Sequence, residues 1–336
     1  MSVLLVEDSP LERRVLAEVL EADGRIRVVA TASSAAEALG AAERHRPQVI
    51  TMDLELLGGG GHVPAGIQAI AEIMRVRAVP ILVLSAHVQE REDRLAVEAL
   101  AAGAADLFAK PGRWSEREAD QLRRRVLVLS RVPMTTLHST PAPPPSSRAG
   151  TSRVIGIVAS TGGPATLRTV ISPMVGVPAP ILLVQHIHPS FVRSFGQWLE
   201  DETGVPVRLA VAGELPEPGT VYLAPPRAHL RLGDDRRVVL DPEPSELLNR
   251  PSGDELLSSI ARVVGARGIG CVLTGMGSDG ADGLAQMRSR GALTFAQDGA
   301  SAVVDGMPRA ARDNGAAQRV LPPEQLGPAL VRAARA

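Results

Sequence analysis

The sequence predicts an α/β protein with two doubly wound parallel-sheet domains joined by a proline-rich linker. Short apolar runs alternate with helix-like segments over residues 1–130 and again over residues 153–336. Such alternation is typical of a parallel sheet covered by helices on both faces. Between the two regions, residues 131–152 contain five prolines and many small polar residues. This composition cannot bury enough apolar surface to offset its ordering entropy, so we expect a linker there.

The elements of both domains follow from short apolar runs, which predict buried strands, and from the segments between them. In the first domain we expect strands at residues 3–6, 27–31, 49–52, 81–84 and 107–108, and helices at 11–21, 35–44, 66–75, 91–102 and 116–130. In the second we expect strands near 154–158, 181–184, 207–211, 221–223, 269–273 and 292–295, with helices between several of them.

Composition excludes several classes of protein. Hydrophobic residues make up 45% of the 336 residues and the formal net charge is −1, so bulk charge predicts no nucleic-acid partner. Aromatic residues are only 2%, which leaves few platforms for stacking bases. The single Cys271 excludes an internal disulfide and a cysteine zinc site. No apolar run approaches the roughly 20 residues of a membrane helix and no leader pattern opens the chain, so we expect a cytoplasmic protein without membrane insertion.

Charged and polar residues follow the predicted strands of the first domain. Glu7 and Asp8 end the first strand, Asp53 the third and Ser85 the fourth, and Lys110 follows the fifth. Because the carboxyl ends of parallel strands meet at one edge, we expect these side chains to converge. Crowded carboxylates repel one another unless a cation joins them, and hard oxygen ligands favour Mg²⁺. Each residue taken singly could be an ordinary solvated loop charge.

The second domain opens with an apolar run, residues 154–159, that ends at Ser160 and is followed by Thr-Gly-Gly-Pro. A hydroxyl at the carboxyl end of a parallel strand, with helix amides next to it, suits a nucleophile. Such a serine needs a base and an orienting acid. His186, His188 and His229 are candidate bases at or beyond strand ends, and Asp279 is the candidate acid.

Asp279 lies in a glycine-rich turn that also has the dinucleotide-binding spacing, with Gly275, Gly277 and Gly280 after a strand. A single match to this spacing is weak evidence for a dinucleotide-binding site. A carboxylate inside the loop would repel a pyrophosphate, so orienting a histidine is the better interpretation of Asp279.

The first domain resembles the receiver domain of bacterial response regulators. This resemblance implies a flavodoxin-like fold, phosphorylation by a histidine kinase and bound Mg²⁺. By it Asp53 is the phosphoacceptor, Ser85 and Lys110 contact the phosphate, and the metal is held near Glu7 by Asp8, Asp53 and the backbone carbonyl of Glu55. The chain departs from the family in its glycine-rich residues 58–61 and in having Leu107, next to Phe108, where a switch aromatic is usual.

The second domain is similar to the catalytic domain of the chemotaxis protein-glutamate methylesterase family, CheB. The matching segments are Ala-Ser-Thr-Gly-Gly at 159–163, Gln-His at 185–186, Tyr-Leu-Ala-Pro-Pro at 222–226, Arg-Pro-Ser at 250–252, Thr-Gly-Met-Gly-Ser-Asp-Gly at 274–280, Ala-Gln-Asp at 296–298 and Gly-Met-Pro at 306–308. The resemblance implies a Rossmann-like domain with a triad of Ser160, His186 and Asp279, and the Met276 amide near the oxyanion. It implies no cofactor for the esterase chemistry.

Together the two resemblances imply a monomeric, phosphorylation-regulated enzyme. It would hydrolyse glutamate γ-methyl esters on the cytoplasmic helices of methyl-accepting chemoreceptors, and it could deamidate glutamines. The alternative is a non-catalytic signalling adapter with a receiver domain, which the complete triad disfavours. A DNA-binding regulator is disfavoured too, because no basic recognition helix follows the linker.

Overall fold

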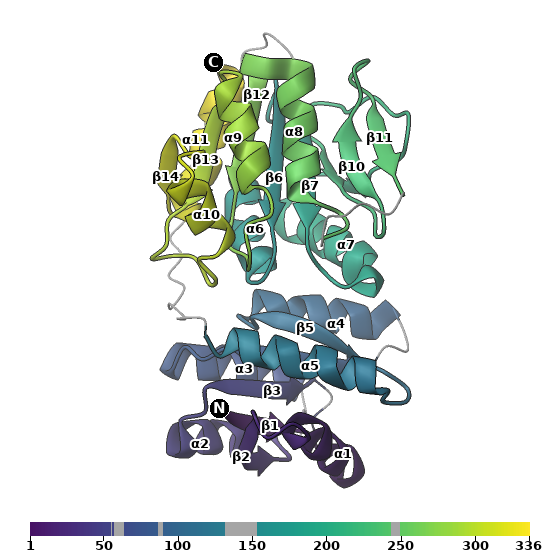
Figure 1. Cartoon of the computed structure of the whole chain (residues 1–336), viewed down its shortest axis with the longest axis vertical. Coiled ribbons are helices and arrows are strands. Elements are labelled where there is room, and N and C mark those ends of the chain that lie inside the picture. The colour runs from purple at the N-terminus through teal and green to yellow at the C-terminus, as the bar shows by residue number, and fades with distance from the viewer. Residues whose placement is uncertain (55, 57–63, 87–89, 132–152, 243–248) are drawn as a thin grey trace. The chain divides into compact units, whose positions relative to one another are not determined.

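The computed structural model describes residues 1–54, 56, 64–86, 90–131, 153–242 and 249–336 (Figure 1). The chain divides into two compact units, residues 1–136 and 137–336. The division falls within the predicted linker, whose residues 132–152 lie outside the described part, as do Glu55 and the glycine-rich residues 58–61.

The first unit is a five-stranded parallel sheet in the order β2-β1-β3-β4-β5. Its elements are β1 Ser2–Val6, α1 Pro10–Glu21, β2 Arg27–Ala32, α2 Ala35–His45, β3 Val49–Asp53, α3 Ala65–Val76, β4 Ile81–Ala86, α4 Glu90–Ala101, β5 Asp106–Lys110 and α5 Glu116–Leu129. Serines begin three of the helices: Ser9, Ser34 and Ser115 each accept a hydrogen bond from an amide in the first turn. The strands place Glu7, Asp53 and Lys110 at one edge.

The second unit contains a seven-stranded, wholly parallel sheet in the order β14-β13-β12-β6-β7-β9-β8. Its strands are β6 Val154–Ala159, β7 Ile181–Gln185, β8 Val207–Leu209, β9 Val221–Leu223, β12 Gly268–Val272, β13 Leu293–Gln297 and β14 Arg319–Leu321. Its helices are α6 Gly163–Ile171, α7 Val192–Thr203, α8 Gly253–Val264, α9 Ala281–Ser289, α10 Met307–Asp313 and α11 Pro323–Arg335, with short 3-10 turns η1 Ser172–Met174, η2 Pro189–Phe191 and η3 Gly265–Arg267.

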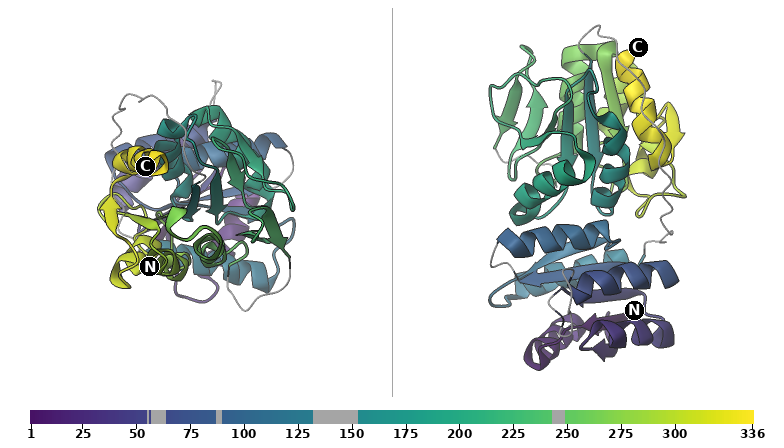
Figure 2. Two further views of the ribbon diagram at one scale, coloured as in Figure 1. Left: turned by 90° about the horizontal axis from the view of Figure 1, so that it is seen from above. Right: turned by 180° about the vertical axis from the view of Figure 1, so that it is seen from behind.

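The chain leaves β6 toward β7 and later returns to β12 on the other side of β6. The strand order therefore reverses between β6 and β12, and open α/β sheets bind ligands at the carboxyl ends of strands at such a point. Helices α8, α9 and α10 cover one face of this sheet, and α6, α7 and α11 cover the other (Figures 1 and 2). Val158, Tyr222, Ile260 and Leu284 belong to the core beneath the first face.

The predicted strands and helices are confirmed to within two residues at their ends, and both domains have the predicted fold class. Two features were not predicted. An antiparallel hairpin, β10 His229–Leu232 with β11 Val238–Asp241, lies outside the main sheet, and β14 adds an edge strand. Residues 319–321 are only three in number and two of them are exposed, so they lack the apolar run that identifies a strand.

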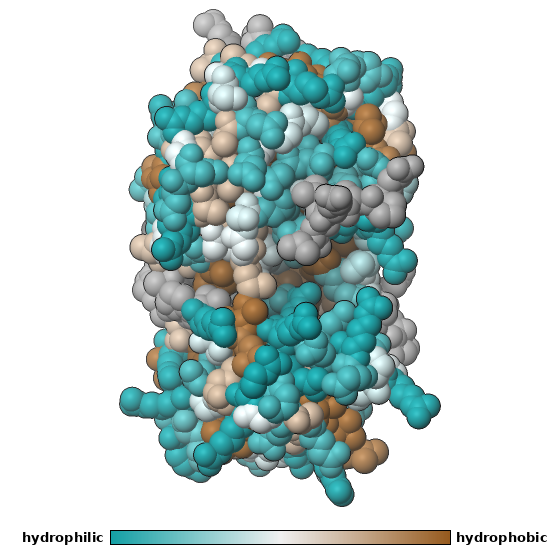
Figure 3. All heavy atoms as spheres, viewed as in Figure 1, coloured by the Kyte–Doolittle hydropathy of each residue, from teal (hydrophilic) through white to brown (hydrophobic). Residues whose placement is uncertain are grey.

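The face shown in Figure 3 is mostly hydrophilic, with hydrophobic residues in small separate groups. Isolated exposed apolar side chains are ordinary on soluble surfaces. Among the described helices, none combines the length and the apolar character needed to cross a membrane.

Candidate active site

Ser160 directly follows β6, whose six residues are all buried, and is itself partly exposed. Its backbone is held on both sides: its amide donates to the Thr274 carbonyl (3.0 Å), and its own carbonyl accepts from the Gly163 amide (2.7 Å). Gly162, at φ +75°, makes the turn that begins α6 only three residues after the serine. Glycine adopts this backbone conformation without steric cost. The sequence thus places a partly exposed hydroxyl at the N-terminus of a helix.

His186 lies beside Ser160 because the β6–β7 ladder ends at the pair Ala159 and Gln185. Both residues come immediately after this pair. The His186 amide donates to the Ala159 carbonyl at 2.9 Å, which extends the ladder by one step. The imidazole is mostly buried, with 15% of its side chain exposed.

Asp279 comes from the turn between β12 and α9 and contacts the same histidine. Its Oδ2 lies 2.8 Å from Nε2 of His186, with the ring N–H turned off the line to the oxygen. Nε2 therefore faces the carboxylate, and Nδ1 is the ring nitrogen left for another partner. Gly280 packs against Val158 of β6, so this turn crosses the end of the central strand.

The N-terminus of α8 holds the Asp279 carboxylate. The carboxylate accepts hydrogen bonds from the amides of Gly253 (2.7 Å) and Asp254 (3.0 Å) and from the hydroxyl of Ser252 (2.8 Å). Burial raises the pKa of Asp279, but the contact with His186 and these amides lower it by more, so the net shift is downward. The carboxylate stays ionised, as an acid that orients an imidazolium must.

Asp254 makes the reciprocal contact. Its carboxylate accepts from the Gly283 amide in the first turn of α9 at 2.8 Å, while its own amide donates to Asp279. Asp279, just before α9, therefore caps α8, and Asp254, in the first turn of α8, caps α9. Burial and the neighbouring Asp279 charge, partly opposed by the Gly283 hydrogen bond, raise the pKa of Asp254 to about 6.

Gly275 packs its backbone against Ser160. A Cβ added at Gly275 would lie 2.7 Å from the Ser160 Cβ and would also overlap the Met307 sulfur. The next residue, Met276, is 46% exposed, and its amide makes no hydrogen bond to any part of the chain that the structure describes. An open amide beside the serine suits an oxyanion donor.

Residues 304–307 form hydrogen bonds with the backbone of Gly275. The Gly275 amide donates to the Val304 carbonyl, and the amides of Gly306 and Met307 donate to the Gly275 carbonyl. Asp305 forms two hydrogen bonds with Arg312, of 2.9 and 2.6 Å. Bidentate pairs of this kind restrict geometry as well as adding energy.

The two other candidate histidines do not face Asp279. His188 uses Nδ1 to contact the Ser190 hydroxyl at 2.8 Å, at the start of η2. His229 is fully buried, and its Nδ1 accepts from the Ser252 amide at 3.2 Å. His229 therefore supports the start of α8, which holds Asp279. The Ser-x-x-Glu pattern at 252–255 is a helix-start signal, which indicates where α8 begins but not which side chain its amides hold.

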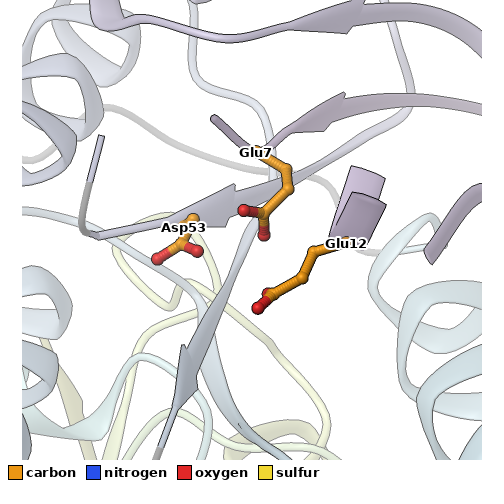
Figure 4. A group of neighbouring side chains, drawn as sticks. All are labelled: Glu7, Glu12 and Asp53. Carbon is orange, nitrogen blue, oxygen red and sulfur yellow. The ribbon is translucent and has the colours of Figure 1, made fainter. Parts of the chain in front are cut away.

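At the edge of the first unit, Glu7, Glu12 and Asp53 lie close together (Figure 4). Lys110 bonds all three of these acids. Its Nζ lies 2.5 Å from Asp53, 2.8 Å from Glu7 and 2.9 Å from Glu12. The structure thus brings together three predicted residues from three strands and adds Glu12 from α1, which the sequence analysis did not single out. Burial lowers the pKa of Lys110, but the Asp53 charge and the carboxylate hydrogen bonds raise it by more. Burial raises the pKa of Glu7 to about 7, and Lys110 opposes that shift.

The donor set fits a hard divalent cation. Carboxylate oxygens of Glu7, Glu12 and Asp53 lie within 4.8 Å of one another, and hard cations prefer such ligands. Asp8 is not one of these three, although it follows Glu7 directly. The other predicted ligand, Glu55, lies outside the described residues.

Ser85 is buried at the end of β4, where it pairs with Ala109 beside Lys110. In the neighbouring strand Leu107 is buried, and Phe108 stacks parallel on Trp114 with ring centroids 6.0 Å apart. The aromatic next to the expected switch position is therefore packed against another ring.

Fold and site together define the class of protein: a response regulator whose second domain has the arrangement of a serine hydrolase. Comparison with known families agrees, since the response regulator receiver domain matches residues 3–119 and the CheB methylesterase family matches residues 155–330. The chain belongs to the CheB methylesterase family.

Relatives match the chain over nearly its whole length. It is 39% identical to protein-glutamate methylesterase/protein-glutamine glutaminase 2 of Paramagnetospirillum magneticum, over 96% of this chain and 94% of that protein. It is 40% identical to protein-glutamate methylesterase/protein-glutamine glutaminase 3 of Anaeromyxobacter dehalogenans, over 96% of each. The crystal structure of the Thermotoga maritima CheB methylesterase catalytic domain is similar with a TM-score of 0.53 and 33% identity, over 55% of this chain and 99% of that one.

Proposed function

We propose that this protein is a phosphorylation-controlled esterase that removes methyl groups from the γ-carboxyl esters of glutamates on chemoreceptors. The observation that carries the proposal is the convergence of Ser160, His186 and Asp279 at the switch point of the second sheet. The names of the full-length relatives support the substrate class. Because all three groups come from one chain, the site needs no second copy, and we propose a monomer acting in the cytoplasm.

The reaction follows from the geometry. The Ser160 hydroxyl attacks the ester carbonyl while Nδ1 of His186, the nitrogen turned away from Asp279, takes its proton. The Met276 amide donates to the oxyanion of the tetrahedral intermediate. The intermediate then expels methoxide, which takes the proton from His186 and leaves as methanol. Asp279 stabilises the imidazolium formed between these transfers.

Water then attacks the glutamyl-serine ester. His186 takes a proton from the water and returns it to the serine oxygen, so that free glutamate and intact enzyme remain. The same groups can act on a glutamine side chain and release ammonia, an activity that the relatives' names also carry. The amide is the harder substrate, since its carbonyl is less electrophilic and amine is a poorer leaving group than alcohol.

Control is assigned to the first domain. We propose residues 1–130 as the receiver, 131–152 as the linker and 153–336 as the catalytic domain. Asp53 accepts a phosphoryl group from a histidine kinase, and Lys110 and Ser85 contact that group. Glu7, Asp8, Asp53 and the Glu55 carbonyl, with Glu12 close by, would hold Mg²⁺, which neutralises charge on the transferring phosphoryl group. The charge of the added phosphoryl group would shift the first domain between two arrangements.

Methanol release from methylated receptor tests the proposal. Ser160→Ala should abolish it, whereas Ser289→Ala, which alters an exposed serine at the end of α9, should leave it unchanged. Labelling by a serine-directed probe should disappear in the first variant only. A Ser160→Ala protein with near-normal turnover would refute Ser160 as the nucleophile. A wild-type protein that is not labelled and releases no methanol would favour the alternative of a non-catalytic adapter.

A further inference from the structure

Gln185, the last residue of β7, bridges the backbones of two catalytic groups. Its side-chain amide nitrogen, Nε2, lies 2.9 Å from the carbonyl oxygen of Ser160 and 2.9 Å from that of His186. The residue is 4% exposed. An amide nitrogen has two protons, so each carbonyl receives one.

The orientation of this side chain is fixed by its partners. Both contacts are carbonyl oxygens, which only accept hydrogen bonds, so the NH₂ end must face them. The other end, Oε1, is buried and receives no hydrogen bond from the described residues. Leaving an amide oxygen unpaired in the interior is unfavourable. The two bonds of Nε2 are what keep the side chain in place.

Gly163 makes room for this arrangement. A Cβ added at Gly163 would overlap Oε1 of Gln185 and would lie 3.0 Å from Nε2. The first residue of α6 therefore lacks a side chain at the position where the glutamine amide packs. The same glycine also donates its amide to the Ser160 carbonyl, so that carbonyl accepts from two directions.

We propose that Gln185 is a positioning residue that fixes the separation of the nucleophile and its base. It does not touch the substrate. By holding the peptide groups that follow Ser160 and His186, it sets the direction of both side chains across the β6–β7 edge. Errors of about 1 Å between reacting groups can cost about 100-fold in rate. This inference rests on the proposed esterase function of the same site.

The test uses the full-length protein and Gln185→Met, which keeps the length of the side chain and removes both donors. We expect kcat for methanol release to fall about 100-fold with KM little changed, and the rate of probe labelling at Ser160 to fall in parallel. Gly163→Ala adds a methyl group that would displace the side-chain amide of Gln185, and it should lower kcat in the same way. If Gln185→Met does not fold, Gly163→Ala decides the question.

Thr294→Val is the matched control. It removes a buried side-chain hydrogen bond in the same sheet, from Thr294 to the Ala316 carbonyl at 2.7 Å, away from the three catalytic residues. We expect it to lower the melting temperature and leave kcat unchanged. A purely structural glutamine would make both variants alike, and that result, or a normal kcat in Gln185→Met, overturns the inference.

The outcome also separates this inference from the proposed function. A wild-type protein whose Ser160 is labelled but that releases no methanol would refute the substrate, and the labelling rates would still decide the role of Gln185. A wild-type protein without labelling refutes the nucleophile, and the inference with it.

Discussion

Nε2 of His186 lies 2.8 Å from Oδ2 of Asp279, and the same carboxylate accepts two amides at the N-terminus of α8. Asp279 therefore serves two partners at once. Helix N-termini favour negative charge, so α8 stabilises the ionised acid and the acid stabilises the helix. The orientation of the catalytic imidazole is linked in this way to the packing of α8 on the sheet.

Asp279→Asn should lower kcat by about 10³- to 10⁴-fold, because an uncharged amide can neither stabilise the imidazolium nor select its tautomer. It should also lower the melting temperature, since an amide is a weaker acceptor for the α8 amides. Methanol release and thermal unfolding measure the two effects. Asp282→Asn, at an exposed acid in the first turn of α9, is the control: it should leave kcat unchanged and lower the melting temperature only slightly. Retention of more than a tenth of the wild-type kcat would contradict the role of Asp279.

The contributions of Asp254 and Asp279 to the free energy of unfolding should change with pH in opposite directions. Burial and Asp279 raise the pKa of Asp254 to about 6, so ionisation of Asp254 opposes folding. Its contribution to the stability of the folded state therefore falls as pH rises from about 4 to 6. The pKa of Asp279 is lowered, so its contribution is present above its usual value near 4 and is lost as pH falls further. The two acids therefore favour folding at opposite ends of this range.

Asp254→Asn should consequently stabilise the second domain above pH 6 and have little effect near pH 4. Unfolding of the second domain within the full chain can be monitored by the loss of probe labelling at Ser160. Asp254→Ala provides the comparison, because it also removes the cap of α9 at Gly283 and should reduce kcat. A stability difference that does not vary with pH would show that Asp254 is not protonated on folding.

Gly275→Ala tests the close approach of the Gly275 backbone to Ser160. The new methyl group would lie 2.7 Å from the Ser160 Cβ, so the serine or the loop must move. We expect kcat to fall at least tenfold with a modest loss of stability. Gly196→Ala is the control, since its added Cβ would meet its nearest neighbour, Leu223, at 3.5 Å and should be accommodated. Equal kcat values for the two variants would show that a glycine is not required beside Ser160.

The sequence was sufficient to place several polar residues at strand ends, because a polar residue directly after an apolar run marks the end of a parallel strand. Ser160, His186, Asp53 and Lys110 all follow this rule. It could not show which ring nitrogen of His186 faces Asp279, because that depends on where the β12–α9 turn lies. Nor could it show that Gln185 bonds two carbonyls, because that depends on the β6–β7 register. The role of the 252–254 segment was also hidden, since its contact with Asp279 spans more than twenty residues. The β10–β11 hairpin was missed because its first strand, His-Leu-Arg-Leu, has two polar residues in four and so shows no apolar run.

Asp53→Asn tests control by the first domain. Lys110 bonds Asp53 at 2.5 Å, and the Asp53 carboxylate is buried at the end of β3. The variant should keep basal methanol release and lose its stimulation by a small phosphodonor with Mg²⁺, and phosphate incorporation should disappear. Chelating the metal should have the same effect on the wild type, because the crowded carboxylates of Glu7, Glu12 and Asp53 need a cation while the anionic donor approaches. Glu18→Gln, at an exposed acid of α1, should respond as the wild type does. Stimulation that persists in Asp53→Asn would mean that the second domain is not controlled through this carboxylate.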